Sequence, residues 1–304
     1  MAVDLRVNIG GIQMRNPVMV ASGTFGYGPE YADVLDLKQL GAIVVKGISL
    51  EGTRGNPPPR TVEVTSGLIN AIGLQNPGLE GFVGTYMPFL RQYDVPVIVN
   101  IWGRTIEEYT EVAARFDRVP GIAGLEVNVS CPNIKEGRSM FGTNMEMFKR
   151  VVAEVRKKTR LPLIIKLAPD ISNLPSFAKA AEECGADALS LINSIPAMAI
   201  DIKTRKPKLG NVTGGLSGPA IRPIAVKLVW EAAKAVKIPI IGLGGISSME
   251  DAAEFFIAGA SAVAVGTANF AEPDTAIRII QKLPAYLRDN GMLSISQLVG
   301  SLRL

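Results

Sequence analysis

The sequence predicts an α/β protein of the (β/α)₈ TIM-barrel class, built as a single domain over residues 1–304. Short runs rich in β-branched residues alternate eight times with longer segments of helical spacing, a pattern that favours a closed parallel barrel. A doubly wound open sheet is the alternative, but its first loop would carry a GxGxxG phosphate motif, which the sequence lacks. The expected strands are Pro17–Ala21, Ala42–Lys46, Val95–Asn100, Gly124–Val129, Leu163–Leu167, Ala186–Asn193, Ile238–Leu243 and Ser261–Gly266.

Two of the connecting helices carry capping signals. Thr105 and Glu108 make a capping box in front of apolar residues that recur at helical spacing. Ser247 and Glu250 make a second box, which predicts that the helix after the seventh strand begins there.

Three segments do not fit the repeat. Residues 4–14 predict an N-terminal β-hairpin that turns at Gly10–Gly11 and plugs the bottom of the barrel. Residues 51–76 and 196–217 are Pro- and Gly-rich insertions that follow strands at the C-terminal face of the barrel. Because barrel active sites lie at that face, we expect these inserted loops to act as lids.

The composition limits the classes of function. The net charge of +4 comes without a dense basic block, and residues 203–208 are typical of a solvated loop rather than a nucleic-acid site. Two cysteines 53 positions apart predict no disulfide framework and are too few for a Cys₄ iron–sulfur or zinc site, so no metal site is expected. The sequence shows no targeting signal and no apolar run long enough to span a bilayer, so a cytoplasmic location is expected.

Polar residues stand at or near the ends of five successive strands, each after an apolar run. They are Lys46, Asn100, Asn128, Lys166 and Asn193. The carboxyl ends of barrel strands converge on one mouth, so these side chains predict a polar site there.

The loops after the last two strands indicate a phosphate site. Gly244 and Gly245 follow the seventh strand, and Gly266 and Thr267 follow the eighth. Exposed backbone N–H groups at a helix start suit a phosphate, which barrels commonly hold at this position. A phosphate there, with a polar cavity across the mouth, favours FMN with a substrate stacked on its ring.

Cys131 is the candidate catalytic base. It follows the fourth strand in a loop that Pro132 stiffens, and a thiol with an ordinary pKa of about 8.5 needs little lowering to act near neutral pH. No histidine is available for this role, and Ser130 is a second candidate. Lys166 is expected to stabilise reduced flavin by its charge, while Lys46 serves flavin and substrate or forms a structural ion pair.

Motifs along nearly the whole chain resemble class 1 dihydroorotate dehydrogenases, and they occur in family order. The segments are VVKG at 44–47, NAIGLQNPG at 70–78, NVSCPN at 128–133, FGTN at 141–144, IKLAPD at 165–170, INS at 192–194, GGLSG at 214–218, GLGGI at 242–246 and VGT at 265–267. The resemblance implies an FMN-containing barrel that oxidises dihydroorotate to orotate during pyrimidine synthesis.

The resemblance also implies roles for individual residues. Cys131 would take a proton from C5 of dihydroorotate while hydride passes from C6 to N5 of FMN. The implied substrate-binding residues are Lys46, Asn70, Ala71, Ile72, Gly73, Leu74, Asn128, Asn193 and Ser194. The implied FMN-binding residues are Ser22, Lys46, Gly47, Asn100, Asn128, Lys166, Ile192, Gly218, Gly244, Gly245, Gly266 and Thr267.

A cysteine base separates the chain from the membrane-associated class 2 members, which use serine. NAIGLQNPG and the segment from Cys131 to Thr143 look more like type 1B than the fumarate-using type 1A. Type 1B implies a homodimer that pairs with a second subunit carrying FAD and a [2Fe–2S] cluster. That heterotetramer passes electrons to NAD⁺.

Three alternatives stay open. A dihydropyrimidine dehydrogenase-like FMN barrel would act on dihydrouracil, which lacks the carboxylate that Lys46 and the amides suit. A non-redox barrel lyase or isomerase would bind a sugar phosphate through the same glycine loops and would purify colourless. A non-catalytic flavin-binding scaffold would not need Cys131 in its motif.

Overall fold

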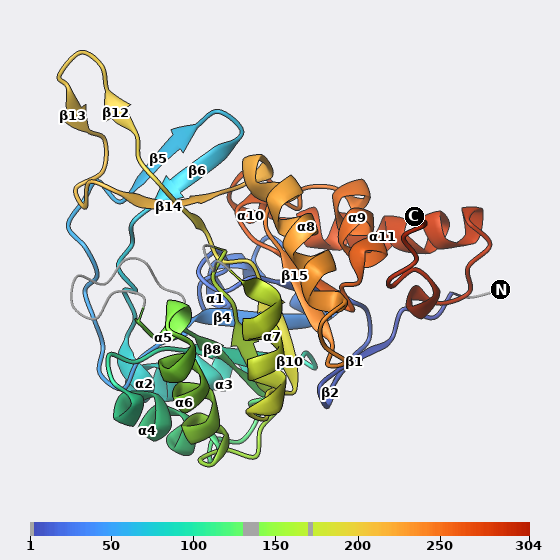
Figure 1. Cartoon of the computed structure of the whole chain (residues 1–304), viewed down its shortest axis with the longest axis horizontal. Helices are drawn as coiled ribbons and strands as arrows, with labels where there is room; N and C mark the ends of the chain where they lie inside the picture. Colours follow the sequence, from blue (N-terminus) through green and yellow to red (C-terminus); the bar gives the residue numbers. More distant parts are fainter. Residues whose placement is uncertain (1–2, 130–139, 170–172) are drawn as a thin grey trace.

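The computed structural model describes residues 3–129, 140–169 and 173–304. Parallel strands close into a barrel (Figure 1). Each barrel strand pairs with the barrel strand that follows it along the chain, and the last one pairs with the first. In this order the barrel strands are β3 (Val18–Val20), β4 (Ala42–Ile48), β7 (Val97–Ile101), β8 (Gly124–Asn128), β9 (Leu163–Lys166), β10 (Ala188–Leu191), β15 (Ile240–Leu243) and β16 (Ala262–Val265). The predicted (β/α)₈ barrel is therefore confirmed, and each strand lies where its β-branched run predicts it.

Helices surround the barrel, but the first connection departs from the expected alternation. Between β3 and β4 the chain forms only the short α1 (Pro29–Ala32) and the 3₁₀ turn η1 (Leu37–Gln39), and the C-terminal α11 packs against β3 instead. The other helical elements are α2 (Gly78–Thr85), α3 (Met87–Leu90), α4 (Ile106–Phe116), α5 (Met140–Thr143), α6 (Met145–Arg156), α7 (Leu174–Glu183), η2 (Pro219–Ile221), α8 (Arg222–Ala233), α9 (Met249–Ala258), α10 (Ala268–Ala271), α11 (Thr275–Asp289) and η3 (Ile295–Gln297).

The predicted cap of α4 is confirmed in its first half. Thr105 Oγ1 accepts a hydrogen bond from the backbone N–H of Glu108 at 3.2 Å. The Glu108 carboxylate reaches back to the N–H of Arg104 rather than to that of Thr105. The start of the helix is thus correctly predicted, although the Glu108 side chain accepts from the residue before the cap instead of from the cap residue itself.

The predicted cap at Ser247 and Glu250 is wrong by one residue. The cap of α9 is Ser248, whose hydroxyl accepts from the N–H of Asp251. The Asp251 carboxylate in turn accepts from the N–H and the hydroxyl of Ser247, and it pairs with Arg222 of α8. This tertiary ion pair favours the register that uses Asp251 over the one that would use Glu250.

The N-terminal hairpin closes the bottom of the barrel, as predicted. Strands β1 (Val7–Ile9) and β2 (Ile12–Met14) pair antiparallel across Gly10–Gly11. Ile9 and Ile12 are buried and pack with inward-facing barrel residues such as Met19 and Ile164. The hairpin thereby fills the barrel end that faces away from the carboxyl ends of the strands.

The two insertions form sheets rather than irregular loops. Strands β11 (Ile195–Ala197), β14 (Gly214–Ser217), β6 (Gly67–Asn70) and β5 (Thr61–Val64) pair in that order, and β12 (Ile200–Asp201) pairs with β13 (Lys206–Pro207). Figure 1 shows these strands together at one end of the barrel, with the β12–β13 hairpin projecting furthest. The small four-stranded sheet gives one edge of the barrel mouth an ordered wall.

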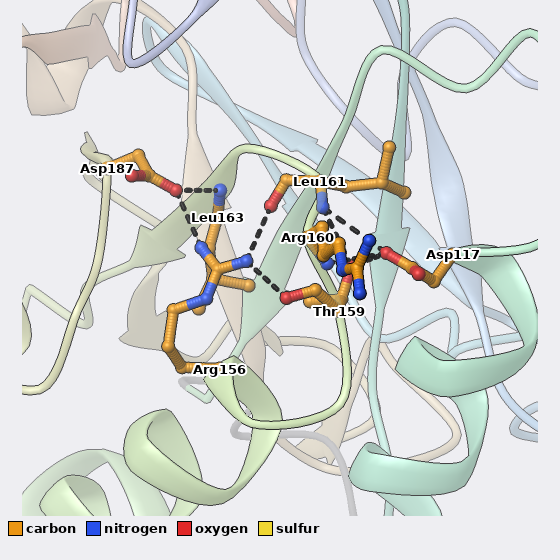
Figure 2. Close-up of polar contacts among 7 residues, drawn as sticks. All are labelled: Asp117, Arg156, Thr159, Arg160, Leu161, Leu163 and Asp187. Atoms are coloured by element: carbon orange, nitrogen blue, oxygen red, sulfur yellow. Dashed lines mark hydrogen bonds and ion pairs between the residues drawn. The ribbon is translucent and has the colours of Figure 1, made fainter.

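A polar clamp joins helix ends to strand starts at the bottom of the barrel (Figure 2). Arg156 pairs with Asp187 at 2.7 Å, and the same carboxylate accepts from the N–H of Leu163 at 2.8 Å. One oxygen of Asp117 accepts from Thr159, Arg160 and Leu161. Burial alone would raise the pKa of the Asp117 carboxyl, but these hydrogen bonds outweigh it and leave the pKa below 3.8. The clamp therefore fixes the connection between α6 and β9.

Candidate active site

A cavity of about 260 Å³ opens at the carboxyl ends of the barrel strands. It gathers side chains and backbone from all eight barrel connections and from the inserted sheet, so residues far apart in the sequence meet in one place. The predicted site residues that line it are Ser22, Lys46, Gly47, Asn70, Ile72, Gly73, Leu74, Asn100, Asn128, Lys166, Ile192, Asn193, Ser194, Gly218, Gly244, Gly245, Gly266 and Thr267.

Two predicted site residues stand apart from this set. Ala71 is fully buried beside Ile69 and Leu209, and it does not line the cavity. Its backbone N–H donates to the Arg60 backbone carbonyl, and its own carbonyl accepts from the Asn56 side-chain N–H, so both groups are used within the insertion. Cys131 and its neighbour Ser130 lie outside the residues that the structure describes.

The floor of the cavity is a buried, charged hydrogen-bond network. Lys166 at the end of β9 is 4% exposed, and its ammonium lies 3.1 Å from Ser22 Oγ and 3.6 Å from Glu126 Oε1. Asn100 donates to the same carboxylate oxygen at 2.6 Å, and Ser190 donates to the other at 2.8 Å. The network therefore fixes Asn100 and Lys166 below the space that a ligand would fill.

Glu126 is the residue of this site that sequence reasoning missed. It lies on β8 two positions before Asn128, so both side chains point to the interior of the barrel. A single carboxylate among the apolar residues at the start of the strand, in the run GLEV, was the available signal, since such a charge is rarely buried without a partner.

Lys46 stands in the wall of the cavity with a perturbed ammonium. Desolvation by burial lowers the pKa of Lys46 below 10.5, and the neighbouring Arg60 guanidinium lowers it further, while Glu30 acts in the opposite direction. Among the described residues Lys46 forms no ion pair within 4 Å, and Glu30 acts on it only as a nearby charge, so the expected structural ion pair is not confirmed. A second cation beside Lys46 makes this wall suitable for an anion.

Amide side chains also line the cavity. The Asn193 side-chain N–H donates to Asn128 Oδ1 at 3.5 Å, and Asn193 Oδ1 accepts from the backbone N–H of Ser194 at 2.8 Å. Tyr109 of α4 donates to the Asn128 backbone carbonyl at 2.8 Å, and Asn70 donates to the Gly215 carbonyl at 3.3 Å. These contacts hold donors and acceptors in place for a flat polar ligand.

The glycine loop after β15 has the backbone form that a close-fitting anion needs. Gly244 and Gly245 have φ angles of +125° and +79°, which side chains rarely adopt. Within the described part of the chain, their N–H groups donate to no protein acceptor. Thr267, after β16, donates to Ser217 at 2.7 Å and so ties the second loop to the inserted sheet.

A closed barrel with a polar cavity and glycine loops at the carboxyl ends of its strands is the arrangement of a (β/α)₈-barrel enzyme. Residues 4–287 match the family model described as dihydroorotate dehydrogenase. The chain therefore belongs to the dihydroorotate dehydrogenase family, a family of oxidoreductases.

Similar curated proteins match along nearly their whole length. Relatives from Geotalea uraniireducens and Geotalea daltonii are 53% and 54% identical, over 98% and 99% of both chains respectively. A relative from Thermoanaerobacter pseudethanolicus is 53% identical over 99% of this chain and 100% of its own. All three are named dihydroorotate dehydrogenase B (NAD(+)), catalytic subunit. Among the described residues, no helix is both long and apolar enough to cross a membrane.

Proposed function

We propose that this chain oxidises (S)-dihydroorotate to orotate, with FMN bound in the cavity at the barrel mouth, and passes the electrons to NAD⁺ through a partner subunit. The observation that carries the proposal is the composition of that one cavity. It combines two lysines, several amides and two glycine loops, which together suit a flavin phosphate and a planar, anionic pyrimidine.

The residues present fit FMN. The N–H groups of Gly244 and Gly245 stand at the loop after β15, where a barrel commonly holds a phosphate. A Cβ added to Gly245 would lie 2.8 Å from the Gly218 carbonyl oxygen, so only glycine leaves this approach open. Lys166, buried and directed into the cavity floor, would hold positive charge beside the N1–O2 edge of the flavin ring.

The remaining polar residues of the cavity fit the substrate. Lys46 would pair with the carboxylate of dihydroorotate, and the amides of Asn70, Asn128 and Asn193 would bind its ring N–H and carbonyl groups. A site built from such groups rejects ligands that leave them unpaired, because each buried unpaired group costs about 1–3 kcal/mol. Dihydrouracil lacks the carboxylate and would leave Lys46 without its anion.

In the proposed reaction, Cys131 removes the C5 proton as a thiolate and becomes a neutral thiol. FMN, when bound, accepts the hydride that leaves C6, so that the C5–C6 bond of the substrate becomes a double bond. Lys166 would stabilise the negative charge that the reduced ring carries, which is the electrostatic role of a fixed cation at a developing anion. Asn128 and Asn193 would orient the substrate ring for both transfers.

The names of the relatives support the acceptor and the partner, because they print NAD(+) and a catalytic subunit. The sequence holds two cysteines, too few to ligate a [2Fe–2S] cluster by itself. We therefore place FAD and the [2Fe–2S] cluster on a separate subunit, which would join a homodimer of this chain in a heterotetramer.

An anaerobic visible spectrum of the purified chain, before and after addition of dihydroorotate, tests the reaction. The expected result is a yellow flavin spectrum that bleaches while orotate forms, with NAD⁺ reduced only when the partner subunit is added. Bleaching by dihydrouracil but not by dihydroorotate would assign the other pyrimidine. A colourless protein that takes up no FMN would reject the proposal.

The role of Cys131 is tested by Cys131→Ser, with Cys184→Ser as the matched control. Cys184 ends α7, and desolvation by burial raises the pKa of its thiol. We expect the Cys131 variant to bind FMN but to slow its reduction by dihydroorotate by a factor of about 10²–10⁴, the usual contribution of a positioned base. The Cys184 variant should react as the wild type, and equal rates in both variants would remove Cys131 from this role.

A further inference from the structure

Glu126 is a buried acidic residue directly beneath the candidate active site. Its side chain is 4% exposed, and it lies under the cavity rather than in its lining. Burying a carboxylate costs several kcal/mol unless hydrogen bonds and an opposite charge compensate for it. A buried carboxylate at this place therefore calls for an account of what it holds.

The contacts of Glu126 come from four different strands or strand ends. Its Oε1 accepts from Asn100 on β7 at 2.6 Å and from Ser22 after β3 at 3.1 Å, and its Oε2 accepts from Ser190 on β10 at 2.8 Å. The Lys166 ammonium on β9 completes the set at 3.6 Å. Three of these four partners line the cavity directly, so Glu126 reaches the ligand only through them.

The charge of Glu126 matters as much as its hydrogen bonds. Any ligand atom in hydrogen-bond contact with the Lys166 ammonium lies within about 7 Å of the Glu126 carboxylate, given a contact of about 3 Å. At that separation the negative charge offsets a large part of the field that Lys166 exerts on the ligand. At an effective dielectric constant of about 20, a unit charge at about 10 Å already shifts an equilibrium by roughly tenfold, so roughly tenfold is a lower bound for a charge at about 7 Å.

We propose that Glu126 is a positioning residue that fixes Lys166, Asn100 and Ser22 under the flavin and, by partly neutralising Lys166, sets the reduction potential of FMN below the value that Lys166 alone would impose. This inference rests on the proposed binding of FMN in the cavity. It concerns the potential rather than the identity of the substrate, so the two can fail separately.

The test is a spectroscopic redox titration of FMN in the Glu126→Gln variant. Glutamine has nearly the same shape and can still accept from Asn100 and donate to Ser190, so the hydrogen bonds survive while the charge is lost. We expect the equilibrium between oxidised and reduced FMN to move at least roughly tenfold toward the reduced form. For a two-electron couple this is a rise of about 30 mV in the midpoint potential.

Asp187→Asn is the matched control, because it neutralises a carboxylate that also pairs with a cation, Arg156 (Figure 2). Asp187 directly precedes β10, so it lies at the end of the barrel away from the cavity. Its potential should equal that of the wild type even where its stability is lower. A general loss of packing would instead change both variants alike.

The double variant Glu126→Gln/Lys166→Met keeps the inference testable if Glu126→Gln does not fold. Removing both members of a buried ion pair is tolerated better than removing one. Lys166→Met alone leaves Glu126 uncompensated and should lower the midpoint potential of FMN. The double variant should restore most of that loss, by moving the ratio of reduced to oxidised FMN roughly tenfold toward the reduced form.

An unchanged or lowered potential in Glu126→Gln, or a double variant no higher than Lys166→Met, would overturn the inference. If the wild type binds FMN and bleaches with dihydroorotate while these potentials do not move, only the inference fails. A wild type that binds no FMN would overturn the proposed function and this inference together.

Discussion

Gly245→Ala is expected to weaken FMN binding by roughly 10- to 100-fold without unfolding the protein. Gly245 has a φ of +79° and lies in the loop after β15, directly at the cavity. An added Cβ would lie 2.8 Å from the Gly218 carbonyl oxygen and 3.0 Å from the Arg222 backbone nitrogen. The Arg222 Cβ also lies 2.8 Å away, and none of these three atoms can move without the backbone, so the segments around Gly218 and Arg222 must move away from Gly245 to admit the methyl group.

The magnitude follows from two contributions. The left-handed backbone conformation costs a residue with a Cβ roughly 1–2 kcal/mol, and the steric overlap adds to this cost. The free loop can relax into another conformation, so binding FMN must restore the strained one and lose that free energy. Each 1.4 kcal/mol corresponds to about a tenfold weaker Kd, which gives the expected range.

The assay is titration of apoprotein with FMN, followed by quenching of flavin fluorescence. Gly291→Ala is the matched control, since Gly291 has a φ of +71° but an added Cβ there meets no atom within 4 Å. That variant should lose a similar amount of stability from backbone strain and bind FMN as the wild type does. A Gly245→Ala protein whose Kd stays within threefold of the wild type would refute the proposed phosphate role of this loop.

Three further predictions concern Lys46, the polar clamp that contains Asp117, and the N-terminal hairpin. Because burial and Arg60 lower the pKa of Lys46, its positive charge is present below that pKa and is lost as pH rises through it, so orotate affinity should begin to fall at a pH below 10.5. Titrations of Lys46→Arg with orotate should show no such fall, and a matching fall in that variant would exclude Lys46 as its cause. Asp117→Ala should cost about 2 kcal/mol in urea unfolding at neutral pH. Since the pKa of Asp117 in the folded protein lies below 3.8, its contribution to the free energy of unfolding is present above pH 3.8 and is lost as the pH falls through the lowered pKa. A stability difference between wild type and Asp117→Ala that grows in acid would contradict this account. Ile12, in the N-terminal hairpin, is 3% exposed, so Ile12→Ala should lower the free energy of unfolding by about 2–4 kcal/mol. Ile202 is 87% exposed, so the control Ile202→Ala should lower it by under about 0.5 kcal/mol. Equal losses in the two variants would show that the hairpin does not pack as part of the core.

The barrel itself could be predicted because its signals are local. Each β-branched run between helical segments marked a strand, and the structure has a strand in each predicted range. The β-hairpin at Gly10–Gly11 was equally clear, since a turn between two alternating segments is a short-range pattern. Polar residues such as Asn100 and Lys166 at the ends of apolar runs pointed to one mouth, and the cavity brings them together.

The inserted sheet was not predictable in the same way. Strands β6 and β14 are short and contain glycine, and they pair across roughly half the chain length. Glycine at 214 and 215 lets the backbone approach Asn70 and Ser194 closely, which a propensity-based prediction treats as a loop signal. The cap of α9 was missed by one residue for a related reason, because the pairing of Asp251 with Arg222 is a tertiary contact.

The sequence by itself determined the barrel, the plug and the set of residues at the mouth, because periodicity, turn residues and motifs are written in neighbouring positions. Only the tertiary structure decided that Glu126 lies beneath Lys166, that Arg60 stands near Lys46, and that Ala71 faces away from the cavity. The physical reason is that burial, charge pairing and the pKa of a lysine depend on groups from other strands. Closing the barrel sets these distances, and no local pattern in the chain contains them.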